Sequence, residues 1–216
     1  MAGVAIQVGR RTQAERSAST RTQLLDATLV CLEELGYGRT TTTEIARRAG
    51  VSRGAQLHHF PSKVELVTQA VEHLFERRHA EFLAAFERLP EGREVRLEAA
   101  IDLLWSMVKG PAFLAWLELA VAARTDPELA EPVGALTRRF VATVDATFRR
   151  LFPGGAHNPF FEAAPRFAFA VLDGLALARL HHQDEAAAER VVDMLKRLAA
   201  LVMPLVTGDA SQGDTR

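Results

Sequence analysis

Residues 40–60 of the chain read TTTTEIARRAGVSRGAQLHHF, and this stretch predicts two short helices joined by a tight turn. Thr41 and Glu44 have the spacing of a capping box, in which each side chain satisfies a free backbone N–H at the start of the first helix. Gly50 can adopt the positive φ that ends a helix. Ser52 is a good N-cap for the second helix, because its hydroxyl can accept hydrogen bonds from the next turn.

The second helix, roughly residues 53–60, is too short to be stable alone, since helix nucleation is costly. It contains no acidic side chain, and we expect it to expose Arg53, Gln56, His58 and His59. A short helix braced by another across a glycine-containing turn is typical of the helix-turn-helix, which presents its second helix to the major groove of DNA. An ordinary helical corner is the alternative that the spacing alone leaves open.

Several motifs around this stretch follow one another in a characteristic order. They are Gly36-Tyr37, Thr41 with Glu44-Ile45-Ala46, Ala49-Gly50-Val51-Ser52, Gly54, Gln56-Leu57-His58-His59-Phe60 and Lys63. Through these motifs the sequence from Cys31 to Lys63 resembles the DNA-binding domain of the tetracycline-repressor (TetR) family of bacterial regulators. The resemblance implies a helix-turn-helix head on a larger helical body that encloses a small-molecule cavity.

We predict DNA contacts from both short helices and from the residues around them. Arg53, Gln56 and Leu57 are expected to read base edges, because arginine suits guanine, glutamine suits adenine and an apolar side chain suits the thymine methyl group. The threonines, the histidines and the lysine are expected to contact phosphates, together with N–H groups at the helix N-termini. The predicted DNA-binding residues are Thr41, Thr43, Arg53, Gly54, Gln56, Leu57, His58, His59 and Lys63.

The composition is that of a globular protein, with 48% hydrophobic and 25% charged residues. No apolar run reaches the ~18 residues of a membrane helix, and the N-terminus lacks the order of a signal peptide, so we expect a cytoplasmic protein. Cys31, the single cysteine, is expected to lie in the core, and a reactive thiol is the alternative. Residues 1–63 hold nine basic and five acidic residues, a net charge of +4, whereas the whole chain has −1. A basic end suits contact with phosphates.

The periodic segments all predict helices, about nine in total, and none alternates as a strand does. We therefore expect an all-α fold: an N-terminal three-helix helix-turn-helix domain and a larger C-terminal helical domain for ligand binding and dimerisation. The two short helices are expected to lie between a first helix, from Ser17 or Ser19 to Leu35, and a long helix over about 63–89. Further helices are expected near 93–109, 111–124, 127–152, 159–182 and 185–206. The expected divisions are a flexible basic arm at 1–16, the DNA-binding domain at 17–63, the helical domain at 64–206 and a disordered tail at 207–216.

The last two predicted helices carry more apolar surface than one core requires. Residues 167–178 are apolar nearly all round, and residues 191–205 carry an apolar stripe at three- and four-residue spacing. We predict that the two helices pair with their twofold copies in a four-helix bundle, since a head that reads a palindrome needs a partner. Burial in the core of a single chain is the alternative.

The helices between carry aromatic side chains with a few embedded acids. An apolar cavity with a few polar anchors is typical of a small-molecule site, and a buried acid without a partner is costly. Asp102, Glu118 and Asp173 are the embedded acids. The residues predicted to line the cavity that the resemblance implies are Trp105, Phe113, Trp116, Phe140, Phe148, Phe169 and Asp173.

Catalytic and cofactor motifs are absent from the sequence. It has no Gly-x-Ser-x-Gly nucleophile motif, no phosphate-binding loop and no dinucleotide-binding glycine motif. Glu76 and His79 have the spacing of helical di-iron ligands, but there is no second copy. We therefore predict no catalytic residue, no metal and no cofactor. The sequence indicates a ligand-responsive dimeric repressor that binds a palindromic DNA operator and is released by a small molecule. The alternatives are a helical small-molecule-binding protein or enzyme without a DNA role, and a structural dimerisation module.

Overall fold

The computed structural model describes residues 12–153, 158–181 and 184–207, and within these ranges the chain forms nine helices and no strand. The predicted all-α fold, with an N-terminal helix-turn-helix and a larger helical body, is confirmed. The helices are α1 (Gln13–Arg39), α2 (Thr42–Ala49), α3 (Arg53–His59), α4 (Lys63–Phe86), α5 (Arg93–Val108), α6 (Pro111–Ala123), α7 (Pro127–Leu151), α8 (Pro159–Arg179) and α9 (Glu185–Thr207).

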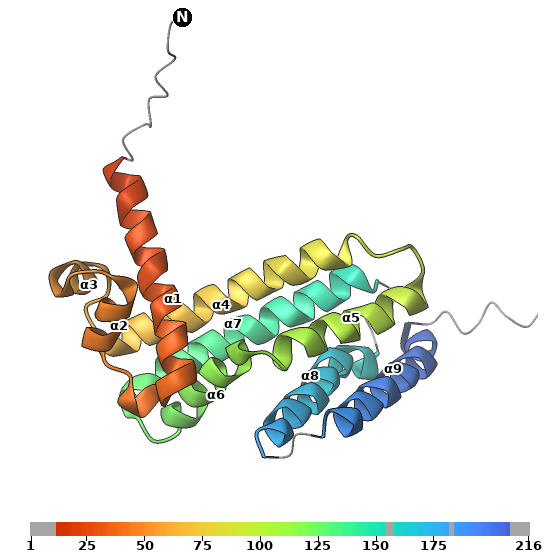
Figure 1. Cartoon of the computed structure of the whole chain (residues 1–216). Coiled ribbons are helices and arrows are strands. Elements are labelled where there is room, and N and C mark those ends of the chain that lie inside the picture. Colours follow the sequence, from red (N-terminus) through yellow and green to blue (C-terminus); the bar gives the residue numbers. More distant parts are fainter. Residues whose placement is uncertain (1–11, 154–157, 182–183, 208–216) are drawn as a thin grey trace, which may run out of the picture.

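We call α1–α3 the head and α4–α9 the body. Figure 1 shows α2 and α3 at one end of the molecule beside α1, while α4 runs from them into the body alongside α7. The C-terminal half of α1 packs beside α6, so the head rests on the body through a second element besides α4. The long connecting helix predicted from the sequence is therefore present, and it ends at Phe86 rather than near Leu89.

Helix α1 begins earlier than the sequence predicted. Thr12 and Glu15 form a reciprocal capping box, in which the Thr12 hydroxyl accepts from the Glu15 N–H at 3.2 Å and the Glu15 carboxylate accepts from the Thr12 N–H at 2.8 Å. Residues 13–16 are consequently helical and not part of an arm. The rest of the predicted arm, residues 1–11, lies outside the described residues, as do most of the predicted tail and the turns at Gly154-Gly155 and Gln183.

The capping box predicted at Thr41 and Glu44 forms only by half, and Ser62 caps α4 with the same single hydrogen bond. The hydroxyls of Thr41 and Ser62 accept hydrogen bonds from the third residue of α2 and α4, at 3.2 and 3.0 Å. The carboxylate of Glu44 instead binds Arg47 and Arg48, and these hydrogen bonds hold its pKa at about 2. A carboxylate committed to two guanidinium groups cannot also reach back to the N-cap N–H.

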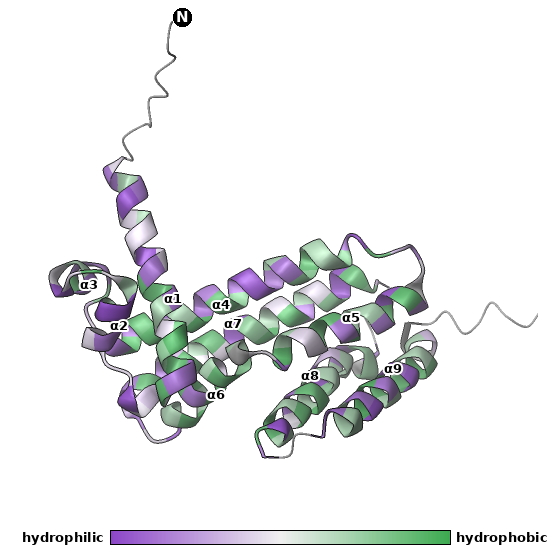
Figure 2. Cartoon of the chain, in the orientation of Figure 1, coloured by the Kyte–Doolittle hydropathy of each residue, from purple (hydrophilic) through white to green (hydrophobic). Residues whose placement is uncertain are grey.

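The core of the head is continuous with the core of the body. Leu24, Cys31 and Phe60 are fully buried in one cluster, and Leu32 joins the next cluster, which is formed with α4, α6 and α7. Cys31 is therefore a core residue as predicted, and burial raises the pKa of its thiol. Figure 2 shows the complementary pattern: the free N-terminal turns of α1 are hydrophilic, and α8 is hydrophobic over much of its length.

Among the described residues, no helix by itself has the length and apolar character needed to cross a membrane; only the bent pair Glu94–Val108 and Ala112–Ala123 meets that test when taken together.

Candidate DNA-binding surface and ligand cavity

The turn between α2 and α3 has the geometry that the sequence predicted. Gly50 has φ 66° and ψ 29°, the left-handed conformation that ends α2. The Ser52 hydroxyl accepts from the Ala55 N–H at 3.2 Å and caps α3. Ile45 and Phe60 are fully buried on either side of this turn, so the short α3 is fixed to the core of the head by both flanking segments.

One side of α3 faces solvent. Arg53, Gly54, Leu57 and His58 are exposed, and the Leu57 side chain has 45% of its surface accessible. Positions 53 and 57, like 54 and 58, are one helical turn apart, so these residues share a face. Of the remaining predicted DNA contacts, Thr41 and Thr43 are exposed at the start of α2 and His59 is half-buried. The helices that carry these residues, α2 and α3, lie beside each other in the head (Figure 1), and the contacts with DNA stay a prediction.

Gln56 was wrongly predicted to be exposed and to read a base. Its side chain is completely buried. Its Nε2 donates to the Phe60 carbonyl at 2.7 Å, and its Oε1 accepts from Arg53 Nη1 at 2.9 Å. Position 56 lies one turn before the buried Phe60 and thus on the core side of α3, where its amide satisfies a carbonyl at the helix C-terminus. Arg53 also donates to the Thr42 hydroxyl, so two groups orient its guanidinium.

Lys63 has an internal partner that the sequence did not reveal. Its ammonium donates to the Tyr37 carbonyl at 2.7 Å and lies 3.8 Å from the centroid of the Tyr37 ring. Burial lowers the pKa of this amine. A phosphate contact by Lys63 stays a prediction, and in the structure the residue fixes the start of α4 to the end of α1.

Tyr37 also connects the head to the body. Its N–H donates to Glu118 Oε2 at 3.1 Å, and its hydroxyl donates to Asp126 Oδ2 at 3.2 Å. Burial and the neighbouring Asp126 carboxylate raise the pKa of the phenol to about 12. Glu118 lies on α6 and Asp126 caps α7. We call Gly36, Tyr37, Lys63, Glu118 and Asp126 the head–body joint.

The first helix was predicted to end at Leu35, directly before Gly36 and Tyr37. Gly36 has φ 72° and ψ 168° inside α1, where it kinks the helix, and α1 continues to Arg39. A Cβ at this position would lie 2.7 Å from Glu118 Oε2. Glu118 had been considered as an acid embedded in the cavity region, and the structure places it in the joint instead. The joint depends on residues 81 and 89 positions apart, which periodicity does not relate.

The body contains a partly open cavity of about 640 Å³. Side chains from α4 to α9 line it, and its walls are mostly apolar. Aromatic rings lie close together along it: the ring centroids of Phe75 and Phe140 are 4.6 Å apart, and those of Phe140 and Phe169 are 5.6 Å apart. Six of the seven residues predicted for the cavity line it, and their contact with a ligand stays a prediction. They are Phe113, Trp116, Phe140, Phe148, Phe169 and Asp173.

Trp105 is the one predicted cavity residue that does not line it. Only 2% of its surface is accessible, and its indole N–H donates to Glu189 Oε1 at 3.0 Å. The ring therefore packs in the core between α5 and α9. The spacing of the aromatic residues could not distinguish a core position from a cavity position, because both occur at the same helical spacing. Asp102, another embedded acid, is paired with Lys196 at 2.5 Å.

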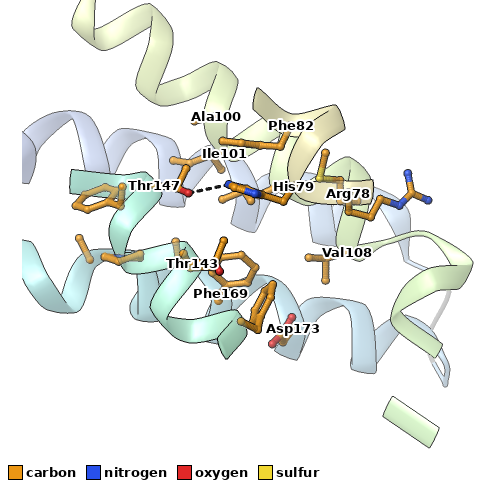
Figure 3. A pocket seen from close by; sticks show the side chains of 18 of the residues that line it. Arg78, His79, Phe82, Ala100, Ile101, Val108, Thr143, Thr147, Phe169 and Asp173 are labelled. Carbon is orange, nitrogen blue, oxygen red and sulfur yellow. Dashed lines mark hydrogen bonds between the residues drawn. The ribbon is translucent and has the colours of Figure 1, made fainter. Parts of the chain in front are cut away.

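The polar groups of the cavity lie on opposite walls (Figure 3). On α4, His79 Nε2 is 2.8 Å from the Thr147 hydroxyl of α7, and burial together with Arg150 lowers the pKa of the imidazole. On α8, Asp173 forms no hydrogen bond or ion pair with the rest of the described chain, and burial raises its pKa to about 6. Sequence reasoning missed His79 and Thr147, because an isolated polar residue in a long helix resembles a surface position.

Metal ligation has no support in the part of the chain that the structure describes, since no group of three His, Cys, Asp or Glu side chains is placed to hold an ion. Glu76 and His79, the pair with di-iron spacing, have no further carboxylate or imidazole positioned with them.

A braced helix exposed at the end of an N-terminal head, above a helical body with a cavity, defines a helix-turn-helix transcriptional regulator. Two family profiles match the chain: bacterial regulatory proteins of the tetR family over residues 24–70, and the C-terminal part of BetI-type transcriptional repressors over residues 93–204. The chain belongs to the TetR family of bacterial transcriptional regulators.

A relative with a regulatory name spans most of the chain. The HTH-type transcriptional regulator CymR of Pseudomonas putida is 34% identical over 184 residues, which is 84% of this chain and 90% of the relative. The names of the relatives point to regulators of transcription and not to enzymes.

Two solved structures share the fold and were determined with ligands. A transcriptional regulator from Saccharomonospora viridis in complex with choline has a TM-score of 0.64 at 17% identity, covering 84% of this chain and 96% of its own. The regulator FadR from Bacillus subtilis in complex with stearoyl-CoA has a TM-score of 0.63 at 16% identity, covering 87% of this chain and 98% of its own.

Proposed function

We propose that the protein is a homodimeric repressor that binds a palindromic operator and is released from it when a small molecule occupies the cavity of the body. In this proposal residues 17–63 bind DNA and residues 64–206 bind the effector and dimerise. A regulator of this kind acts in the cytoplasm, where the bacterial chromosome lies. The observation that carries the proposal is the exposed face of α3, on which Arg53 and Leu57 stand one turn apart on a buried support.

The exposed face of α3 has the chemistry of base recognition. Thr42 and Gln56 accept the two hydrogen bonds that orient the Arg53 guanidinium, and they hold it at the N-terminal end of α3. The N-terminal end of a recognition helix is the end that contacts base edges. The exposed Leu57 offers an apolar contact for a thymine methyl group. Twofold symmetry would place two such helices about one DNA turn apart, ~34–36 Å.

Apolar surface on α8 and α9 supports the dimer. Most of the large hydrophobic side chains exposed in the described chain lie on these two helices or directly after α8, and an apolar patch of this kind marks an interface. Some of them also line the cavity, so a partner docked there would cover that part of it. The exposed residues are Phe160, Phe167, Leu177, Leu180, Met194, Leu198, Leu201 and Val202.

The joint offers a route from the cavity to the head. Trp116 of α6 and Phe140 of α7 line the cavity, while Glu118 and Asp126 on the same helices hold Tyr37. A ligand that moves α6 against α7 would therefore move the end of α1 and spread the two heads. Such a ligand must bind the spread state more tightly than the DNA-bound state, because a conformational equilibrium shifts only by the difference in affinity.

DNA binding is tested with Arg53→Ala and Leu57→Ala, using duplexes selected by the wild-type protein from a randomised pool. Each variant should bind the selected duplex about five- to 150-fold more weakly, which corresponds to about 1–3 kcal/mol for one base contact. Arg88→Ala is the matched control, since Arg88 is exposed and follows the C-terminal end of α4, the end away from α3 in sequence. Selection of no common sequence, or equal losses in all three variants, would contradict the proposal.

The interface is tested separately by changing Met194 and Leu201, which are 57% and 69% exposed and do not line the cavity. The double variant Met194→Glu, Leu201→Glu should be monomeric in sedimentation. Val95→Glu, at an equally exposed apolar residue of α5, should remain dimeric. A dimeric double variant would place the interface elsewhere.

A further inference from the structure

Asp173 is a carboxylate without a partner in an apolar cavity. It lies on α8 among the residues that line the cavity, it is partly buried, and no hydrogen bond or ion pair joins it to another described residue. Figure 3 shows it on the wall opposite His79. An isolated charge away from bulk water is costly unless another group neutralises it, and proteins normally supply such a group. No described residue does so here.

The cationic side chains around the cavity are already neutralised. Arg139 binds Glu72 at 2.8 Å, and Arg78 binds Glu81 at 2.9 Å, while the buried Arg78 Nε has no hydrogen-bond partner among the described residues. His79 is the remaining basic group that lines the cavity, and its lowered pKa favours the neutral imidazole, which is hydrogen-bonded to Thr147. An anionic ligand would therefore meet arginines whose charge an acid already balances, whereas a cationic ligand finds a free carboxylate.

Aromatic rings continue from the Asp173 carboxylate along the cavity. Phe169 lies one turn before it on α8, and its ring forms an edge contact with Phe140. Phe140 is followed by Phe75, and Phe75 by Trp116, with centroids 4.6 and 5.4 Å apart. The faces of aromatic rings attract cations, and this attraction grows when water is excluded.

We propose that the effector is a lipophilic organic cation, an ammonium group carried on an apolar body, with Asp173 as its counter-ion and the Phe169–Phe140–Phe75–Trp116 row as the wall for its apolar part. The inference rests on the proposed function only in taking this cavity as the effector site. The volume of about 640 Å³ falls in the range of sites for drug-sized molecules, roughly 300–1,000 Å³, so the cation carries an apolar body that fills it.

The raised pKa of Asp173 agrees with this assignment. Burial without a counter-charge raises it to about 6, which reflects how poorly the apolar surroundings tolerate the ionised carboxylate. A bound ammonium would supply the missing opposite charge and a charge-assisted hydrogen bond, and both favour the ionised form.

The experiment uses three probes that share one apolar body: phenylbutylamine, phenylbutanol and phenylbutyrate. Calorimetric titration of the full-length protein should show the amine binding at least about tenfold more tightly than the alcohol, and the acid more weakly than both. In Asp173→Asn the affinity for the amine should fall about tenfold or more, to that of the alcohol, while the affinity for the alcohol changes little. Glu76→Gln is the matched control, since Glu76 is an exposed carboxylate of the same cavity, and it should keep the preference for the amine.

Three outcomes would overturn the inference: an acid that binds as tightly as the amine, a preference for the amine that persists in Asp173→Asn, or no binding of the amine at millimolar concentration. The selected-duplex assay on the same preparation reports on the proposed function independently. If DNA binding is retained and any of these outcomes occurs, the cationic effector is rejected and the proposed regulatory function stands. If the protein does not bind DNA, the proposed regulatory function is rejected, and the titrations still decide the ligand class.

Discussion

Replacing Gly36 by alanine tests the head–body joint more directly than any change to a charged residue. Gly36 has φ 72° and ψ 168°, a region that is essentially restricted to glycine and costs another residue about 1–3 kcal/mol. The added Cβ would also lie 2.7 Å from Glu118 Oε2. Since Glu118 is an exposed, flexible side chain, its carboxylate would move aside and release the Tyr37 N–H, an exposed hydrogen bond of about 0.5–1 kcal/mol.

Gly36→Ala should therefore lower the free energy of unfolding by roughly 1.5–4 kcal/mol, measured by urea denaturation. Gly38→Ala is the matched control two residues away, because a Cβ there meets nothing within 4 Å and its backbone is helical. This control should be neutral or stabilising by up to about 1 kcal/mol. In a Glu118→Ala background Gly36→Ala should cost only the backbone strain, about 1–3 kcal/mol. Equal effects of the alanine at positions 36 and 38 would refute the kinked backbone, and an equal cost of Gly36→Ala with and without Glu118 would refute the contact.

Two further predictions concern buried polar groups. Gln56→Ala should lower the free energy of unfolding by about 1–3 kcal/mol, because the Phe60 carbonyl loses its donor, and it should leave the base preference of the selected duplexes unchanged. Asp173 has a pKa of about 6 in the fold against 3.8 ordinarily, so its ionised form destabilises the protein above about pH 6 and this penalty vanishes below about pH 4. Asp173→Asn should thus stabilise the ligand-free protein by about 1–2 kcal/mol near pH 8, after discounting for partial solvent access, and by less near pH 5. Urea titrations at the two pH values would measure this difference. A gain in stability that does not depend on pH would contradict the titration assigned to Asp173.

Local patterns in the sequence were sufficient for most of the fold. The apolar spacing, Gly50, Ser52 and the prolines that begin α6, α7 and α8 act within one or two turns, and the helices that they predict are present with ends displaced by a few residues. The start of α1 was missed because Thr12 and Glu15 were included with the basic arm. Caps of this kind depend on four adjacent residues, so that signal was available in the sequence.

The orientation of side chains was harder to predict than the helices that carry them. Gln56 and Leu57 are neighbours on α3, and sequence reasoning placed both toward DNA, yet one is fully buried and the other is 45% exposed. The difference arises from the direction in which the rest of the head lies, which the seven residues of α3 do not specify. Trp105 and Trp116 differ in the same way: the first packs on α9 and the second lines the cavity, although both are aromatic residues on central helices.

Charge placement explains why the cavity and the joint can be coupled without sharing residues. In the apolar cavity the half-buried Asp173 carboxylate has no partner among the described residues, while the joint uses two carboxylates, Glu118 and Asp126, that are satisfied by Tyr37. A ligand that neutralises Asp173 binds most tightly when the aromatic walls close around the ligand. Its binding free energy therefore depends on the positions of α6, α7 and α8. The joint also depends on the positions of α6 and α7, which hold Tyr37 through Glu118 and Asp126. The two sites therefore bias the same pair of helices, and by linkage any ligand that weakens DNA binding must itself bind less tightly to the DNA-bound protein, by the same factor.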